Sequence, residues 1–238
     1  MSLYLKRAIL IFIVMLMIVV YLTVTLYQRD FRSAFSGDTA KNIVIDPGHG
    51  EPDGGAVGYN GTEEQEINLI IAQKLNAKLD KMCYNTRMTR DTEEGIYSEG
   101  STIKEKKVSD MHNRESIMND ENTGIFVSVH LNIYSDKSSH GAQVFYSVND
   151  DDSKALGESI QAELLRADPT NSRVAKSAGS SIYLMKKAKV PAVIVECGFI
   201  SNPHEECILC TNDYQVRIAT AIARGIDLYY KEKNEESD

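Results

Sequence analysis

An uncharged run near the amino terminus divides this chain into two parts with different surroundings. From Ala8 to Tyr27 no residue carries a charge, and most are Ile, Leu, Val, Met or Phe. A helix of about 20 residues spans roughly 30 Å, the thickness of the hydrocarbon core of a bilayer. A buried helix of a globular domain is seldom this long and this apolar. The sequence therefore predicts a membrane segment within residues 1–27.

This segment has two interpretations, a retained anchor and a cleaved signal peptide. Lys6 and Arg7 precede the run, which is typical of a cytoplasmic amino end, although Arg29 and Arg32 follow it. A signal peptide has a shorter apolar region, about 7–15 residues, and then a small-x-small cleavage site. Residues 27–30 are a poor match to such a site. We expect an anchor, with the signal peptide as the alternative, and both place the remainder outside the cytoplasm, membrane-anchored or secreted.

The remainder has the composition of an ordinary globular domain. Hydrophobic residues make up 42% and charged residues 25% of the chain, which excludes disordered and collagen-like classes. Residues 1–40 hold four basic and two acidic side chains, so 22 basic and 32 acidic ones follow. So acidic a body is poorly suited to nucleic acid, because phosphates require many Lys and Arg. We predict a linker over 28–40, one domain over 41–231 and a polar tail over 232–238.

Two kinds of apolar run alternate along this body. Short β-branched runs predict buried strands, and runs with apolar residues every three or four positions predict helices. Strands that alternate with helices predict an α/β domain with a mostly parallel or mixed sheet covered on both faces. Thr62 and Gln65 fit a capping box at the start of the clearest helix. The predicted strands are 42–46, 85–90, 124–130, 142–148 and 192–196, and the predicted helices are 62–82, 106–119, 153–167, a short one opened by Asn202-Pro203, and 214–231.

Three predicted strands lead into chemically capable residues. The first leads into His49, the third ends on His130, and the fifth ends on Glu196. Folds of this class place their sites at the carboxyl edge of the sheet. A glutamate that ends a buried strand is costly unless it is paired, bound to metal or in a cleft. Two histidines and a carboxylate form a zinc-type ligand set, and the candidates for the third ligand lie within residues 63–66.

Taken singly, these residues also have ordinary explanations. A lone histidine is more often structural than a ligand, and a carboxylate at a helix start is favoured by the helix dipole. Glu196 could equally pair with a Lys or Arg. The combination at one sheet edge favours a site. His112, His140 and His204 have no such placement, and we expect them in surface or structural roles.

The four cysteines do not form a complete metal motif. A single Cys207-x-x-Cys210 pair is weak support, since a structural zinc site usually has two such pairs. Ordinary packing on a short helix explains the spacing of these two residues and His204. We expect free thiols, with a disulfide and a second metal as the alternatives.

Four short motifs follow one another along the body: Asp46-Pro47-Gly48-His49-Gly50, Glu64-Gln65-Glu66-Ile67-Asn68-Leu69, Ser128-Val129-His130-Leu131-Asn132, and residues 191–202 from Pro191 to Asn202. In this order they resemble the zinc-dependent N-acetylmuramoyl-L-alanine amidases, which cleave peptidoglycan. The resemblance implies one α/β domain with a six-stranded sheet flanked by helices. It implies His49, Glu64 and His130 as ligands of a Zn²⁺ cofactor and Glu196 as the catalytic acid/base. Glu64 is selected by its distance from Asn68-Leu69.

Within this family, one membrane segment followed by one compact domain resembles the spore-cortex germination amidases. These remove the stem peptide so that muramic-δ-lactam can form. The implied reaction is hydrolysis of the amide between N-acetylmuramic acid and L-alanine, with Asp46 or Asn132 orienting a ligand histidine. We see no wall-binding repeat, so we expect an activator or accessory protein on the extracytoplasmic face. The alternatives are another zinc hydrolase of the wall, an endopeptidase or deacetylase, or a non-catalytic wall-binding membrane protein.

Overall fold

The structure, a computed structural model, describes residues 3–35, 42–179 and 182–237. The chain divides into two compact units, residues 1–40 and 41–238. The first contains helix α1 (Leu3–Phe35), in which Tyr4–Thr23 is long and apolar enough to cross a membrane, with a mean hydropathy of 2.5. The helix continues past Tyr27, so residues 28–35 of the predicted linker are helical. The rest of that linker lies outside the described residues.

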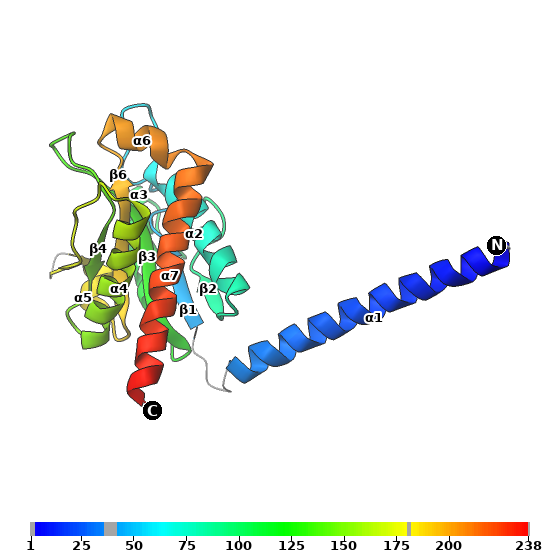
Figure 1. Ribbon diagram of the computed structural model, residues 1–238. Coiled ribbons are helices and arrows are strands. Elements are labelled where there is room, and N and C mark those ends of the chain that lie inside the picture. The colour runs from blue at the N-terminus through cyan, green and yellow to red at the C-terminus, as the bar shows by residue number, and fades with distance from the viewer. Residues whose placement is uncertain (1–2, 36–41, 180–181, 238) are drawn as a thin grey trace. The chain divides into compact units, whose positions relative to one another are not determined.

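The second unit is built on one six-stranded sheet (Figure 1), in the order β2-β1-β3-β6-β4-β5. Strands β2, β1, β3 and β6 run parallel to one another, and β4 runs antiparallel to β6 and parallel to β5. The predicted α/β class and the mixed six-stranded sheet are therefore confirmed. The strands are β1 (Asn42–Pro47), β2 (Thr86–Met88), β3 (Thr123–Asn132), β4 (Gln143–Tyr146), β5 (Lys176–Ser177) and β6 (Ala192–Phe199).

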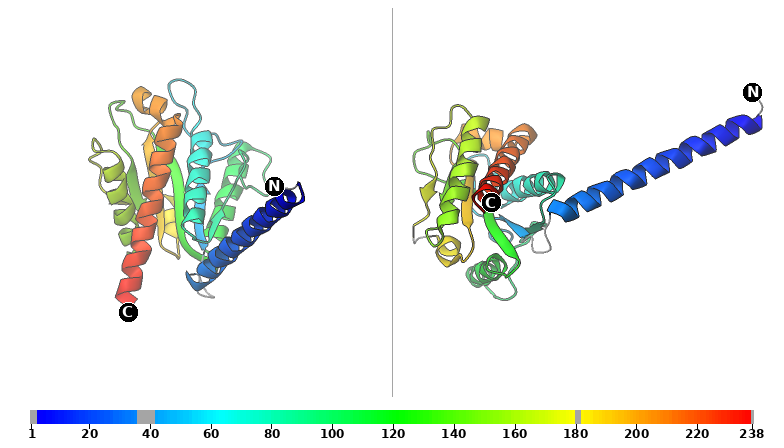
Figure 2. Two further views of the ribbon diagram at one scale, coloured as in Figure 1. Left: turned by 45° about the vertical axis from the view of Figure 1, so that its right-hand side comes forward. Right: turned by 60° about the horizontal axis from the view of Figure 1, so that its bottom comes forward.

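Helices cover both faces of this sheet. On one face α7 lies between α2 and α4 and packs against both (Figures 1 and 2). The other face is covered by α3 and the short α5, which contact each other. Helix α6 follows β6 directly. The helices are α2 (Glu64–Lys81), α3 (Ile103–Met118), α4 (Asp151–Ala167), α5 (Tyr183–Lys187), α6 (Pro203–Leu209) and α7 (Asn212–Ser237).

The alternation of side chains along each strand decides which residues meet which layer of helices. In β3, Val127 belongs to the larger apolar cluster with α2, α4 and α7, and Phe126 belongs to the smaller cluster with α3 and α5. By the same alternation His130 points to the α3 side. Asp46 in β1 and Glu196 in β6 also fall on this side, so the polar residues of three adjacent strands share one face.

Several helix boundaries differ from the prediction. The capping box predicted at Thr62 is wrong, because α2 begins at Glu64 and its N-cap, Glu63, makes no side-chain cap bond. A capping box instead opens α3, between Thr102 and Glu105. Helix α7 continues through most of the predicted polar tail, since Glu and Lys are good helix formers. The prediction that Asn202 caps a short helix is confirmed, because its side chain accepts from two backbone N–H groups of α6.

Candidate metal centre

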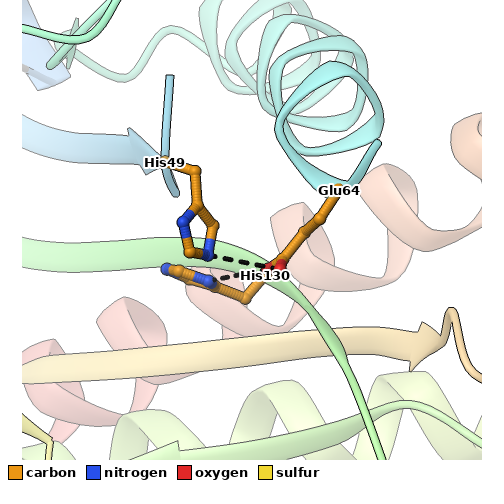
Figure 3. Close-up of side chains that lie close together, drawn as sticks. All are labelled: His49, Glu64 and His130. Carbon is orange, nitrogen blue, oxygen red and sulfur yellow. Dashed lines mark hydrogen bonds and ion pairs between the residues drawn. The ribbon is translucent and has the colours of Figure 1, made fainter. Parts of the chain in front are cut away.

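The structure brings His49, Glu64 and His130 together at the carboxyl edge of the sheet (Figure 3). His49 lies on the loop after β1, Glu64 is the first residue of α2, and His130 lies near the end of β3. Nε2 of His49 is 3.2 Å from Oε2 of Glu64, and Nδ1 of His130 is 3.0 Å from Oε1 of the same carboxylate. The three potential donor atoms lie within 4.8 Å of one another. Two imidazoles and one carboxylate are a donor set that suits zinc.

The loop that carries His49 approaches β3 too closely for any side chain at Gly48. A Cβ there would lie 2.2 Å from Cε1 and Nε2 of His130. The next residue, His49, has a φ of 62°, in the left-handed region that non-glycine residues seldom adopt. Such backbone is kept only where surrounding contacts determine it.

Arg90 supplies part of those contacts. Its side chain is buried and donates hydrogen bonds to the carbonyl oxygens of Pro47 (3.1 Å), Gly48 (2.9 Å) and Gln65 (2.9 Å). One guanidinium therefore joins the His49 loop to the first turn of α2, which carries Glu64. Five donors in a rigid plane make arginine suited to such multiple bonding.

Arg114 holds the same loop from the α3 side. It is 1% exposed, donates to the carbonyl oxygens of Pro47 and His49, and forms ion pairs with Asp46 and Asp110. Burial alone would raise the pKa of Asp46, but the Arg114 charge and hydrogen bonds hold it below its ordinary value. The buried charges thus compensate one another and fix the backbone on both sides of Gly48.

Asp53 contacts the ligand candidate His49 from behind. Its Oδ2 is 2.9 Å from Nδ1 of His49 and 2.8 Å from Nζ of Lys107. The sequence predicts Asp46 or Asn132 as the partner of a ligand histidine, but the partner of His49 is Asp53, and Asp46 pairs with Arg114. Burial lowers the pKa of His49, but hydrogen bonds to Asp53 and Glu64 outweigh it and raise the pKa to about 9. In the sequence, the signal that could have indicated this contact is the four-residue spacing of His49 and Asp53 in a glycine-rich loop.

Glu64 is the most enclosed of the acidic residues at the start of α2. It is 4% exposed, and its carboxylate accepts from the backbone N–H groups of Ala56 (2.9 Å) and Leu131 (3.1 Å). Burial by itself raises its pKa, but bonds from His130 and His49 hold the pKa well below the ordinary value. Glu63 is half-buried and Glu66 exposed. The glutamates within residues 63–66, all candidates for the third ligand in the sequence, thus differ clearly in their surroundings.

Glu196 faces the cluster from β6, where it pairs in register with His130. The residue is half-buried, yet its Oε2 is fully enclosed and has no hydrogen-bond partner among the described residues. Burial raises the pKa of Glu196 to about 7, although the charge of His130 works in the opposite direction. An enclosed polar atom without a partner is costly, and such atoms in native proteins commonly mark a ligand site.

Residues 43–228 match the N-acetylmuramoyl-L-alanine amidase family. The chain belongs to this family. The germination-specific N-acetylmuramoyl-L-alanine amidase of Bacillus subtilis (strain 168) is 33% identical to this amidase over 198 residues, which is 83% of each chain. The CwlD amidase of Clostridioides difficile, solved in complex with the GerS lipoprotein, is 38% identical, with a TM-score of 0.77 over 80% of this chain and 98% of that one. The CwlV catalytic domain of Bacillus (Paenibacillus) polymyxa var. colistinus is 27% identical, with a TM-score of 0.68 over 80% and 98% of the two chains.

The cluster of this amidase opens into a narrow crevice on the α3 side of the sheet. Its volume is about 110 Å³. Polar and charged residues, including Lys107, line it together with apolar residues, among them Met111 of α3. The apolar residues from α5, β6 and the residue before α5 are Ile182, Leu184 and Ile194.

The remaining histidines and the cysteines are not part of the His49–Glu64–His130 cluster. His112, His140 and His204 are exposed, in agreement with the surface roles predicted for them. Cys83, Cys197, Cys207 and Cys210 are all free thiols. Sequence reasoning missed Arg90 and Arg114, because nothing in a single sequence distinguishes a buried arginine from the many that lie on surfaces.

Proposed function

We propose that this amidase uses zinc to hydrolyse the amide between N-acetylmuramic acid and the L-alanine of the stem peptide in peptidoglycan. The single observation that carries the proposal is the His49–Glu64–His130 cluster beside the enclosed, unpartnered Oε2 of Glu196. The family match supports the substrate class. An endopeptidase or a deacetylase would cleave other bonds of the same polymer.

His49, Glu64 and His130 would hold the zinc ion. Catalytic zinc sites take three protein ligands of this kind and leave one position open. The enclosed oxygen of Glu196 supports the fit, since the burial of this carboxylate is explained if a reacting group meets it. When bound, zinc polarises the scissile carbonyl and lowers the pKa of the attacking water.

Glu196 transfers the proton in this proposal. Its Oε2 accepts a proton from the attacking water and then delivers it to the nitrogen of the departing L-alanine. Burial favours the protonated form of Glu196, which helps the carboxyl group to hold the proton between the two halves of that cycle. Strand β6 holds the side chain on a rigid element, so little entropy is lost in positioning it.

Asp53 orients His49 in this proposal. Its bond to Nδ1 leaves Nε2 of His49 facing Glu64, so Nε2 would be the nitrogen that holds zinc. Arg90 and Arg114 act one step further out, because they hold the loop carbonyls on either side of Gly48.

The place of action is the spore cortex in this proposal, where removal of the stem peptide precedes muramic-δ-lactam formation. The name of the germination-specific relative supports it. The CwlD neighbour was solved with a lipoprotein, which supports an accessory protein on the extracytoplasmic face here as well. Helix α1 serves as the membrane anchor, and the catalytic unit lies outside the cytoplasm.

The test is mass spectrometry of cortex fragments incubated with the zinc-loaded full-length protein in detergent. We expect a released stem peptide with a free L-alanine amine and a glycan strand that keeps its lactyl group. Cleavage between amino acids, or loss of acetate alone, would contradict the proposed bond. His130→Ala should lose most of the bound zinc together with the activity, because two ligands hold zinc poorly.

A further inference from the structure

A second hollow is lined in part by residues that follow Ala56 and Leu131, whose backbone N–H groups donate to the Glu64 carboxylate. Its volume is about 410 Å³, within the range of small-ligand sites. One wall is part of the loop between His49 and Glu64, and the other follows His130 by a few residues. Two segments thus supply both the potential metal ligands and this hollow, which we call the tyrosine groove. It is lined by Val57, Gly58, Tyr59, Ile133, Tyr134, Ser135, Lys137 and Ser201.

The tyrosine groove exposes large apolar side chains to solvent. Tyr59 is 75% exposed and Tyr134 is 59% exposed, and Val57 and Ile133 lie beside them with similar exposure. A group of exposed apolar side chains beside a site favours a binding surface, whereas single exposed residues carry no such meaning. Nζ of Lys137 lies 5.6 Å from the centre of the Tyr59 ring, so a cation is present at the rim.

The loop that carries Tyr59 is held rigidly from α6. Glu206 is 1% exposed, and its carboxylate accepts from the backbone N–H of Asn60 (2.9 Å), from the side-chain Nδ2 of Asn60 (3.0 Å) and from the N–H of Thr62 (3.4 Å). A Cβ at Gly58 would lie 2.3 Å from this carboxylate, so only glycine permits the approach. The buried carboxylate of Glu206 thus holds the loop backbone beside Tyr59, whose side chain is exposed to solvent.

The opposite wall is also fixed. The backbone N–H of Tyr134 donates to Oγ of Ser201 at 3.0 Å, and the N–H of Ile200 donates to the carbonyl of Asn132 at 2.9 Å. Aromatic side chains on rigid backbone lose little entropy when they bind a ligand. The backbone of both walls is therefore held in place by contacts within the protein.

We propose that the tyrosine groove binds the glycan strand of the substrate, with N-acetylated sugar rings stacked on Tyr59 and Tyr134. A pyranose ring presents apolar C–H faces and a hydroxyl edge, which match tyrosine rings flanked by the hydroxyls of Ser135 and Ser201. The alternative occupant is the stem peptide, which carries free carboxylates. Among the residues that line the groove only Lys137 is cationic, and the body as a whole is acidic. The assignment rests on the proposed function, and it leaves the narrow crevice for the scissile amide.

The probe is chitotetraose, an oligomer of N-acetylglucosamine that has neither the lactyl group nor the scissile amide. Its binding to the full-length protein in detergent is measured by saturation-transfer NMR, beside that of the free tripeptide L-alanyl-γ-D-glutamyl-diaminopimelate. We expect wild-type protein to bind chitotetraose at millimolar concentration. The Tyr59→Ala/Tyr134→Ala double variant should bind it about tenfold more weakly, because two stacking surfaces are lost. Tripeptide binding should not change.

Tyr97→Ala is the matched control, because Tyr97 also lies beneath a lysine, Lys106, but does not line the groove. It should bind chitotetraose like wild type. Unchanged zinc content and thermal midpoint in the double variant exclude a folding defect. In turnover of muropeptides the double variant should raise KM about tenfold and change kcat less than about twofold.

Three results would overturn the glycan assignment: no chitotetraose binding by wild type, equal binding by the double variant, or a loss confined to the tripeptide. These results do not depend on hydrolysis. A protein that binds chitotetraose through the two tyrosines but releases no stem peptide would contradict the proposed function and leave the groove assignment standing.

Discussion

One face of the sheet packs against α2, α4 and α7 through a large apolar cluster, whereas the face beneath α3 and α5 combines a smaller apolar cluster with buried charges. The same strands serve both, because neighbouring residues point to opposite sides. In β6, Val195 belongs to the large cluster and Glu196 faces the His49–Glu64–His130 cluster. The difference indicates that the apolar face supplies most of the stability, and that this stability offsets the cost of the charges on the other face.

The largest effect that would separate the two faces is loss of turnover without loss of folding. Glu196→Gln keeps the size of the side chain but cannot accept a proton. Because acid–base groups contribute about 10²–10⁴-fold, kcat should fall by that order. Peptide release and zinc stoichiometry are measured on the same samples. Near-normal turnover would remove the catalytic role, and a joint loss of zinc would make Glu196 a ligand.

Arg114→Met tests whether the charged face depends on its internal pairing. The variant leaves Asp46 buried with hydrogen bonds from Thr89 and Ser128 but without its ion-pair partner, which typically costs about 3–5 kcal/mol of unfolding free energy. Urea unfolding measures the loss, and zinc affinity should fall with it, because the His49 carbonyl loses its donor. Arg114→Lys keeps the charge and should recover part of both. Unchanged zinc affinity in the methionine variant would show that the loop does not need this arginine.

Ile222→Ala makes the corresponding change on the apolar face. Ile222 is fully buried on α7, and removing its side chain beyond Cβ should cost about 2–5 kcal/mol. Zinc affinity of the folded fraction should stay at the wild-type value, since α7 supplies none of the cluster. A large fall in affinity would mean that the two faces are coupled more tightly than their separate clusters indicate.

Asp53→Asn tests the orientation of His49 with little effect on stability. The amide of the variant can still contact Nδ1 of His49. It lacks the negative charge that favours the form of His49 that binds a metal ion. Comparable changes behind ligand histidines lower metal affinity about 10–100-fold. Competition with a zinc chelator measures the affinity. Lys107→Gln is the control for the loss of the neighbouring ion pair, and an equal effect there would shift the role from His49 to the lysine.

The smallest effect concerns pH in the metal-free protein. The ordinary pKa of 4.5 for Glu196 is raised to about 7 by burial, so the folded chain binds a proton more readily than the unfolded chain between these values. Stability should therefore fall as the pH rises from 4.5 to 7, by at most about 1.4 kcal/mol per unit. Glu196→Gln should flatten this part of the profile, measured by urea unfolding in EDTA. Parallel profiles for the two proteins would contradict it.

In the metal-free protein, His49 adds a second pH-dependent change in stability. Wild type and Glu196→Gln should share this change. Despite burial, bonds to Asp53 and Glu64 raise its pKa from 6.5 to about 9. Its contribution is complete below pH 6.5 and is lost as the pH rises through 9.

The sequence was sufficient to predict the strands that carry the site, because short apolar runs ending in His130 and Glu196 are local patterns. The alternation of strands and helices along the chain then predicted that these residues lie at one edge of the sheet. β5 and α5 were missed, since elements of two and five residues leave no periodicity. The helix of residues 28–35 was missed because its mixed polar and apolar residues suit a linker as well as a helix.

The support behind the site could not be predicted in the same way. Arg114 is 65 residues away from His49 in the chain and contacts it through a backbone oxygen, which leaves no mark on the sequence of either segment. Glu206 and Asn60 are 146 residues apart. Contacts of this kind follow from the packed fold and not from local preference. Asp53 was within reach of sequence reasoning, because its spacing from His49 is short.

The close approach of Gly48 to His130 links the sequences of two segments that lie far apart in the chain. A single methyl group added there would occupy the space of the His130 ring, 2.2 Å away. The two positions cannot be substituted independently. A residue larger than glycine at position 48 would require a smaller or displaced side chain at position 130, near the end of β3. Descendants of this chain that keep a histidine at position 130 are thus bound to keep a glycine at position 48, and a designer who transplants one segment into another protein must transplant both.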